Sequence, residues 1–140
     1  MSLRTKSREF AMQMLFQWDM SRQDPAKLEA KFWRSAKAAD NTRAFANKLF
    51  EGAAKDADAL DALIVQHAQN WRLERMAIID RAVLRLAIYE LRSKDTPPKV
   101  VLNEAIDLAK KFSSEGAGAF VNGILDAVNK ALVEKADAAK

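Results

Sequence analysis

The sequence predicts one all-α domain spanning residues 1–140, with about seven helices around a buried fifth helix. Its 140 residues suffice for one hydrophobic core and are too few for two. Only 4 Gly and 3 Pro interrupt the chain, and no window shows the alternation of apolar and polar residues that is typical of strands. Apolar residues instead recur at helical spacing along most of the chain.

The first two predicted helices are amphipathic. From Ser7 to about Met20, one helical face carries Phe10, Ala11, Met14, Leu15 and Trp18. Residues 1–6 precede this helix, and we expect them to form a basic, flexible arm. Asp24 and Pro25 supply an N-cap followed by proline at the first helical position, so a second helix is expected to run to about residue 39.

Two further helices lead to the predicted centre of the fold. A third helix is expected from residues 40–41 to about Gly52, and a fourth from about residue 56 to 69. Residues 76–92 are apolar almost all round, with only Arg81 and Arg85 forming a polar edge. A helix of this composition belongs in the middle of a bundle.

Prolines separate the fifth helix from the sixth. Pro97 and Pro98 end the fifth helix, and residues 99–102 are expected to be extended. Asn103 is a plausible N-cap for the sixth helix, which continues to Phe112. Gly116 is expected to end that segment in the left-handed conformation.

The stretch AFVNGILDAV, residues 119–128, contains the Asn-Gly pair that marks many hairpin turns. Its apolar residues nevertheless keep helical spacing from Phe120 to Leu132, which a hairpin would break. We therefore predict a last helix in which Gly123 and Ala127 let another helix approach closely. Residues 133–140 are expected to form a frayed tail.

Composition disfavours an enzyme. The chain has no Cys and one His, His67, so metal sites and disulfides are not expected. No nucleotide-binding or nucleophile motif is present, and Glu104 and Asp107 are typical of a first helical turn. We expect no catalytic residue, no metal and no cofactor. The absence of a long apolar run or signal peptide favours a cytoplasmic protein without a membrane partner.

The amino-terminal segment is the most informative part of the surface. The net charge is +4, and Arg4, Lys6 and Arg8 precede the first acidic residue. On the wheel of the first helix, Met12 and Phe16 point away from the apolar face. Cations beside an exposed aromatic ring suit single-stranded RNA, because phosphates need charge and unstacked bases need a π surface. Alternatively, Phe16 packs under the second helix or against a twin subunit.

Four segments, in order, resemble the NusB family of bacterial transcription antitermination factors. They are REFAMQMLFQWD (8–19), VLRLAIYEL (83–91), KVVLNEAIDLAKKF (99–112) and FVNGILD (120–126). The resemblance implies a small all-α protein of two helical subbundles. It also implies binding of boxA RNA as a heterodimer with ribosomal protein S10 (NusE), within the RNA polymerase antitermination complex and notably in ribosomal RNA operons. A member of this family is expected to catalyse no reaction.

The resemblance also implies roles for single residues. Arg4, Lys6 and Arg8 correspond to the arginine-rich arm that binds RNA, interrupted here by Thr5 and Ser7. The other implied contacts are Phe16 for both RNA and S10, Asp80 for S10, and Phe120 for RNA.

Two other functions fit the same features. NusB-like domains also serve RNA recognition in ribosomal RNA cytosine methyltransferases, although no residues remain after 140 for a cofactor domain. A helical interaction scaffold with little RNA binding is the second alternative, and the pattern is also compatible with a homodimer.

Overall fold

The computed structural model describes residues 2–69 and 71–139, and within these the chain is helical with no strand. The prediction of an all-α fold with about seven helices is confirmed. In chain order the helices are α1 (Leu3–Ser21), α2 (Pro25–Ser35), α3 (Asp40–Lys55), α4 (Ala57–His67), the 3₁₀ turn η1 (Leu73–Arg75), α5 (Ile78–Ser93), α6 (Pro98–Phe112) and α7 (Glu115–Ala138).

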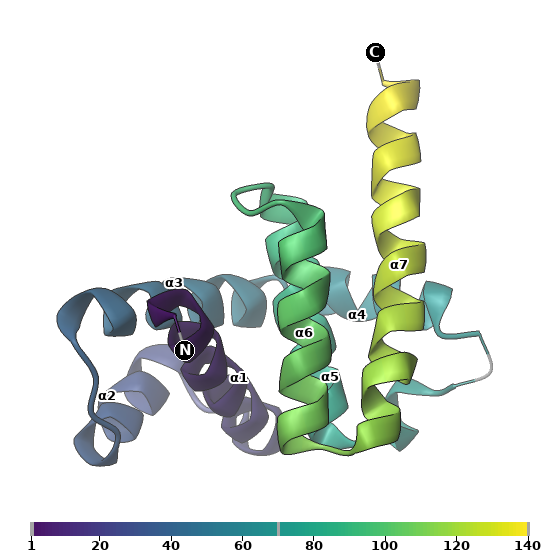
Figure 1. The fold of residues 1–140 in the computed structure, drawn as a ribbon. Coiled ribbons are helices and arrows are strands. Elements are labelled where there is room, and N and C mark those ends of the chain that lie inside the picture. The colour runs from purple at the N-terminus through teal and green to yellow at the C-terminus, as the bar shows by residue number, and fades with distance from the viewer. Residues whose placement is uncertain (1, 70, 140) are drawn as a thin grey trace.

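Helix α5 lies at the centre, as its apolar composition predicts. It packs against α1, α3, α4, α6 and α7, and residues 82–88 are all buried. Figure 1 shows α1, α2 and α3 gathered on one side, with α6 and α7 standing side by side on the other. The carboxyl-terminal half of α7 extends beyond the rest of the bundle (Figure 1). No helix in the described part of the chain has the length and apolarity to cross a membrane.

Several helix boundaries differ from the prediction. Helix α2 ends at Ser35, and α6 begins at Pro98, so residues 99–102 are helical and not extended. Proline fits there because the first helical N–H groups have no partner within the helix. Gly116 lies in the first turn of α7 and has no positive φ, so the predicted left-handed stop is wrong. The expected tail from residue 133 is helical to Ala138.

The Asn122-Gly123 pair lies within α7, which confirms the helical interpretation of this stretch. The expected close approach of a helix at Gly123 is wrong, because no atom of another element lies near a Cβ built there. Such an approach occurs instead at Gly52 in α3, where a Cβ would overlap the ring of Tyr89 from α5. Because Gly52 has no side chain, the Tyr89 ring of α5 packs directly against the backbone of α3.

Arg85 does not form the exposed polar edge predicted for the fifth helix. It is 1% exposed, and its guanidinium donates to both carboxylate oxygens of Asp61, at 2.7 and 3.0 Å. A second carboxylate, that of Asp19, lies 3.2 Å from Nη1. Burial opposes the charged guanidinium, but these carboxylates outweigh it and raise the pKa of Arg85 above its ordinary value. The pairs join α5 to α4 and α1.

Helix α2 packs on the end of the bundle through aromatic rings and also buries an acid. Phe32 and Trp33 make edge-to-face contacts with Phe10 of α1. Glu29 is 8% exposed, and its Oε1 has no hydrogen-bond partner among the described residues. Burial, the hydrogen bond with Glu51 and the nearby Asp24 raise the pKa of Glu29 to about 8.

Replacing Glu29 by Gln is expected to remove part of the pH dependence of stability. Because the pKa of Glu29 is higher in the folded chain than in the unfolded one, its protonation favours the fold in acid, and this contribution is lost as pH rises through about 8. Urea unfolding should therefore show Glu29→Gln more stable than wild type by about 2 kcal/mol above pH 8, and by much less near pH 5.

The exposed Glu134 of α7 provides a control, since Glu134→Gln changes the same group at the surface. It should follow the wild-type pH profile. If the free energy of unfolding of Glu29→Gln ran parallel to that of wild type at all pH values, the assignment of Glu29 as a buried protonated acid would be wrong.

Candidate nucleic-acid interface

The amino-terminal cations lie on a helix and do not form an arm before it. Helix α1 begins at Leu3, and the hydroxyl of Ser2 caps it by accepting from the Thr5 N–H at 3.0 Å. The expectation of a separate arm over residues 1–6 is therefore wrong from Leu3 onward. At about 100° per residue, Arg4 and Lys6 project about 200° apart on this helix. Helical geometry thus separates two cations that the sequence places side by side.

Arg8, which was predicted to contact RNA, is buried and paired within the fold. It is 3% exposed. Its Nε and Nη2 donate to the two carboxylate oxygens of Glu90 at 2.8 and 2.9 Å, and Nη1 lies 3.4 Å from Glu104. Burial opposes the charge, but Glu90 and Glu104 raise the pKa of Arg8 above its ordinary value. The guanidinium therefore joins α1 to α5 and α6, and its donor groups are engaged within the fold.

Thr5 and Ser7 do more than interrupt the basic segment. The Thr5 hydroxyl donates to Glu104 in α6 at 2.7 Å. Ser7 is buried, and its hydroxyl lies 3.0 Å from both the Leu3 carbonyl within α1 and the Thr42 carbonyl of α3. These bonds hold the first turns of α1 between α3 and α6. Sequence reasoning missed this role, because the partners in α3 and α6 lie at least 35 residues away.

Lys6 and Phe16 lie about 80° apart around α1 and differ in exposure. Lys6 is exposed and lies 3.8 Å from Glu9, which also accepts from Lys111 of α6 at 2.9 Å. Phe16 is half-buried and packs against the core. Its exposed part fits a ring that stacks on RNA, and its buried part fits a ring that packs within the protein. Met12 is 2% exposed, and its predicted outward orientation is wrong. Helices α2, α3 and α5 all pack on α1, which widens its buried arc beyond the apolar stripe.

A second aromatic site lies at the start of α7. Phe120 is half-buried, and its ring meets that of Trp71 edge to face with centroids 5.4 Å apart. Trp71 is 56% exposed. Sequence reasoning named Phe120 and not Trp71, although a tryptophan between helices, followed by Arg72, was a signal available for it.

Asp80 lies in the first turn of α5 and is nine-tenths buried. Its Oδ1 has no hydrogen-bond partner within residues 2–69 and 71–139. The positive end of the α5 dipole stabilises a carboxylate at this position. Oδ1 is itself buried, so a donor from another molecule reaches it only if the neighbouring side chains move.

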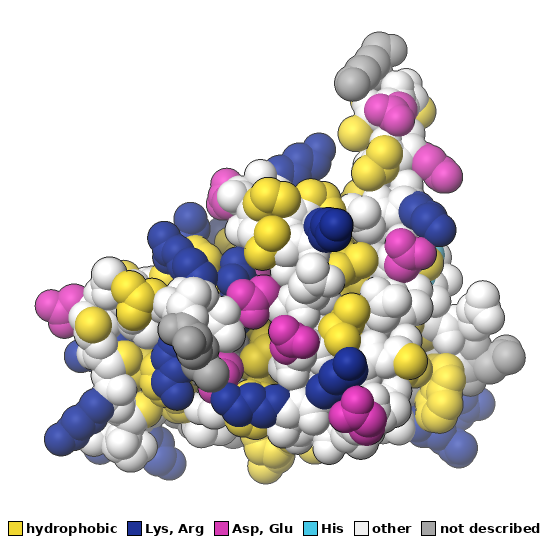
Figure 2. Space-filling view, viewed as in Figure 1, with side chains coloured by type: hydrophobic (Ala, Val, Ile, Leu, Met, Phe, Trp, Pro, Cys, Tyr) yellow, Lys and Arg dark blue, Asp and Glu magenta, His cyan; other side chains and the backbone are white. Residues whose placement is uncertain are grey.

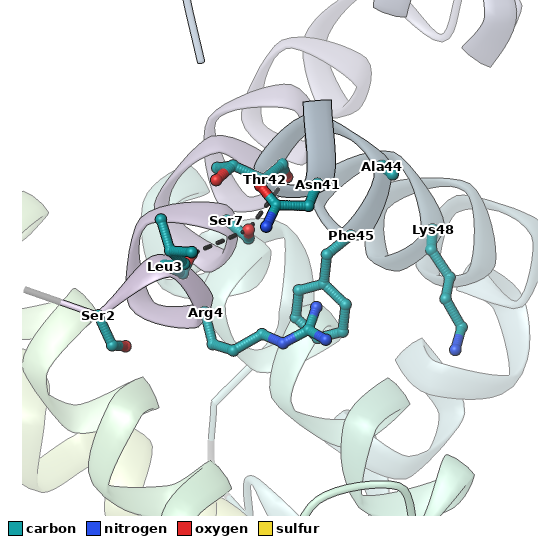
Figure 3. Close-up of a pocket in the computed structure, with 9 residues that line it drawn as sticks. All are labelled: Ser2, Leu3, Arg4, Ser7, Asn41, Thr42, Ala44, Phe45 and Lys48. Atoms are coloured by element: carbon teal, nitrogen blue, oxygen red, sulfur yellow. Dashed lines mark hydrogen bonds between the residues drawn. The ribbon is translucent and has the colours of Figure 1, made fainter. Parts of the chain in front are cut away.

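The first turn of α1 and α3 enclose a hollow of about 640 Å³ (Figure 3). The Arg4 guanidinium lies across the ring of Phe45, 3.7 Å from its centroid, with the Lys48 side chain extending beyond the ring (Figure 3). Asn41 lines the same hollow, and none of the described residues around it is acidic. On the face drawn in Figure 2, basic side chains are interspersed with acidic ones.

Comparisons with known proteins identify relatives over nearly the whole chain. The NusB family model matches residues 5–130. The transcription antitermination protein NusB of Koribacter versatilis is 45% identical, covering 92% of this chain and 90% of that protein. NusB of Myxococcus xanthus is 43% identical and covers 94% of this chain and 98% of that protein.

Solved structures agree with this similarity. The solution structure of NusB from Aquifex aeolicus is 30% identical with a TM-score of 0.84, covering 96% of this chain and 93% of that one. A crystal structure of antitermination factors NusB and NusE in complex with dsRNA matches with 31% identity and a TM-score of 0.83, covering 94% and 98%.

Truncating Arg8 tests its assignment to the interior. Arg8→Ala is expected to lower the free energy of unfolding by about 3 kcal/mol or more, because Glu90 then stays buried without its partner. Lys6→Ala removes an exposed cation of the same helix and should cost less than about 0.5 kcal/mol. Urea unfolding monitored by circular dichroism compares the two variants, and equal stabilities would contradict the burial of Arg8.

Proposed function

The chain belongs to the NusB family of transcription antitermination factors, and on that premise we propose that it binds boxA-type single-stranded RNA together with ribosomal protein S10 (NusE). In this role it joins the RNA polymerase antitermination complex and promotes read-through, notably of ribosomal RNA operons. Action on nascent transcripts implies a cytoplasmic location. The family consists of regulators that catalyse no reaction, and the chain is not an enzyme.

One observation carries the proposal most directly. The structure of NusB and NusE with dsRNA matches this chain over 94% of its length with a TM-score of 0.83. Because the match extends over nearly the whole of both chains, the helices that face RNA and NusE in such an assembly have counterparts here. This supports RNA and NusE as partners, and boxA as the RNA segment comes from the family resemblance.

The described surface supplies suitable groups for both partners. Lys6 is exposed and can neutralise a phosphate, while Phe16 and the Phe120–Trp71 pair offer rings on which bases can stack. For NusE we propose Phe16 and Asp80, the positions that the family resemblance implies. Charge contacts then give salt-dependent affinity, and stacking together with contacts to base edges gives preference for boxA.

Fluorescence anisotropy of a labelled boxA-type RNA tests the proposal. The RNA is titrated with the chain alone and with an equimolar mixture of the chain and NusE, over a salt series. We expect tighter binding with NusE, a preference over a scrambled RNA, and affinity that falls linearly on a log–log plot against salt. Equal binding of boxA and scrambled RNA in the presence of NusE would overturn the proposal.

The variant Phe16→Ala tests whether Phe16 lies at the interface with RNA. The variant should weaken RNA binding by the chain–NusE mixture about tenfold, the scale of one lost stacking contact, and should cost about 1–2 kcal/mol of stability because the ring is half-buried. Leu132→Ala truncates a half-buried residue on α7, far along the chain, and serves as the matched control. Similar RNA affinities for the two variants would remove Phe16 from the interface.

A further inference from the structure

The hollow beside Arg4 continues along α3. A second hollow of about 430 Å³ adjoins it, and both are lined by Ala44 and Lys48. The second hollow is also lined by Lys55, by the acidic Glu51 and Asp56, and by Tyr89, whose ring lies on Gly52. Together the two hollows follow α3 over residues 41–56, which is about 22 Å of helix.

Groups on α3 form one stripe along these hollows. Asn41, Phe45, Lys48, Gly52 and Lys55 stand at positions i, i+4, i+7, i+11 and i+14, the spacing of a single helical face. The opposite face of α3 is buried in the core through Ala46, Leu49, Phe50 and Ala53. We call the stripe, together with Arg4 and Tyr89 of the neighbouring helices, the α3 track.

The cations of the α3 track are available to a ligand. Within the part of the chain that the structure describes, Arg4 and Lys55 have no hydrogen-bond or ion-pair partner, and the Asn41 side chain has no hydrogen bond. Lys48 has only a 3.7 Å contact with Asp95, and both side chains are more than 60% exposed. Such a surface contact contributes little energy and yields readily to a phosphate.

Aromatic rings alternate with these cations. Phe45 lies between Arg4 and Lys48 in the first hollow, and Tyr89 lines the second with Lys48 and Lys55. The Arg4 guanidinium, held across the Phe45 ring, is itself a plane on which a base can stack. Cations that follow a backbone, interleaved with π surfaces, are the pattern of single-stranded nucleic-acid binding. An acidic peptide would use the cations and leave the rings without a role.

We propose that the α3 track binds a single-stranded RNA segment outside the boxA core, so that the RNA contacts two sides of α1. Arg4 serves the track, whereas Lys6 and Phe16 serve the boxA site, since Arg4 and Lys6 project about 200° apart. This inference rests on the proposed function and extends it with contacts from α3 that carry affinity and little sequence preference.

Two RNAs and two double variants test the track in the full chain with NusE present. One RNA is the boxA core alone, and the other carries ten uridines on each side of it. Lys48→Gln/Lys55→Gln removes two cations of the track. Lys31→Gln/Lys135→Gln removes two exposed cations from α2 and α7, with the same change of net charge. All four positions are exposed, so thermal unfolding should be unchanged.

We expect the track variant to bind the extended RNA about fivefold to tenfold more weakly than wild type, and to lower its log–log salt slope by about 1.4, or about 0.7 for each lost phosphate contact. Its binding of the core RNA and the behaviour of the control variant should stay at wild-type values. Wild-type affinity and slope of the track variant on extended RNA would overturn the inference. Weaker NusE binding with unchanged RNA binding would also overturn it, and would assign the track to a protein partner.

The two proposals fail in different ways. If wild type binds boxA and scrambled RNA equally, the boxA proposal is wrong, while the track variant still decides the α3 track on the extended RNA. If boxA preference is intact and the track variant matches wild type, only the track is wrong. Absence of any RNA binding by wild type with NusE would overturn both.

Discussion

The buried ion pair between Arg8 and Glu90 is the interaction on which the arrangement of the helices depends. It joins α1 to the central α5 by two hydrogen bonds, and Glu104 of α6 approaches the same guanidinium. Removing two charges from water costs about as much free energy as the pairing returns. The contribution of the pair is therefore specificity, because any shift of α1 along α5 would leave a charge buried without its partner.

This constraint determines what the surface can offer. With Arg8 held inside, the first turns of α1 sit between α3 and α6, fastened by Ser7 and Thr5. Arg4 is then carried to the Phe45 ring of α3, and Lys6 to the side shared with Glu9 and Lys111. A basic segment that is continuous in sequence becomes two sites on opposite sides of one helix. The buried pair thus determines the direction in which each exposed cation of α1 projects.

Patterns within one helix were predictable, and contacts between distant helices were not. Apolar periodicity gave the all-α fold, the central fifth helix and the helical course through Asn122-Gly123. The prediction failed at the start of α6, where residues 99–102 were expected to be extended after the two prolines, although Pro98 is a good first helical residue. The prediction also failed for Met12, because helices that pack on several sides of α1 bury this side chain.

The functional residues show the same difference between local patterns, which were predictable, and distant contacts, which were not. Charge and helical periodicity pointed to Arg4, Lys6 and Phe16, and the family resemblance pointed to Phe120 and Asp80. Neither could reveal that Arg8 pairs with Glu90, 82 residues later. The α3 track also depends on tertiary structure, because Arg4 meets Phe45 only when α1 and α3 pack together.

A double-mutant cycle on Arg8 and Glu90 tests the central claim most directly. Urea unfolding is measured for wild type, Arg8→Met, Glu90→Leu and the double variant. If the pair fixes α1 on α5, each single variant leaves a buried charge, the double variant is more stable than the less stable single variant, and the coupling free energy is about 2–3 kcal/mol. Additive effects, with coupling below about 0.5 kcal/mol, would contradict the account.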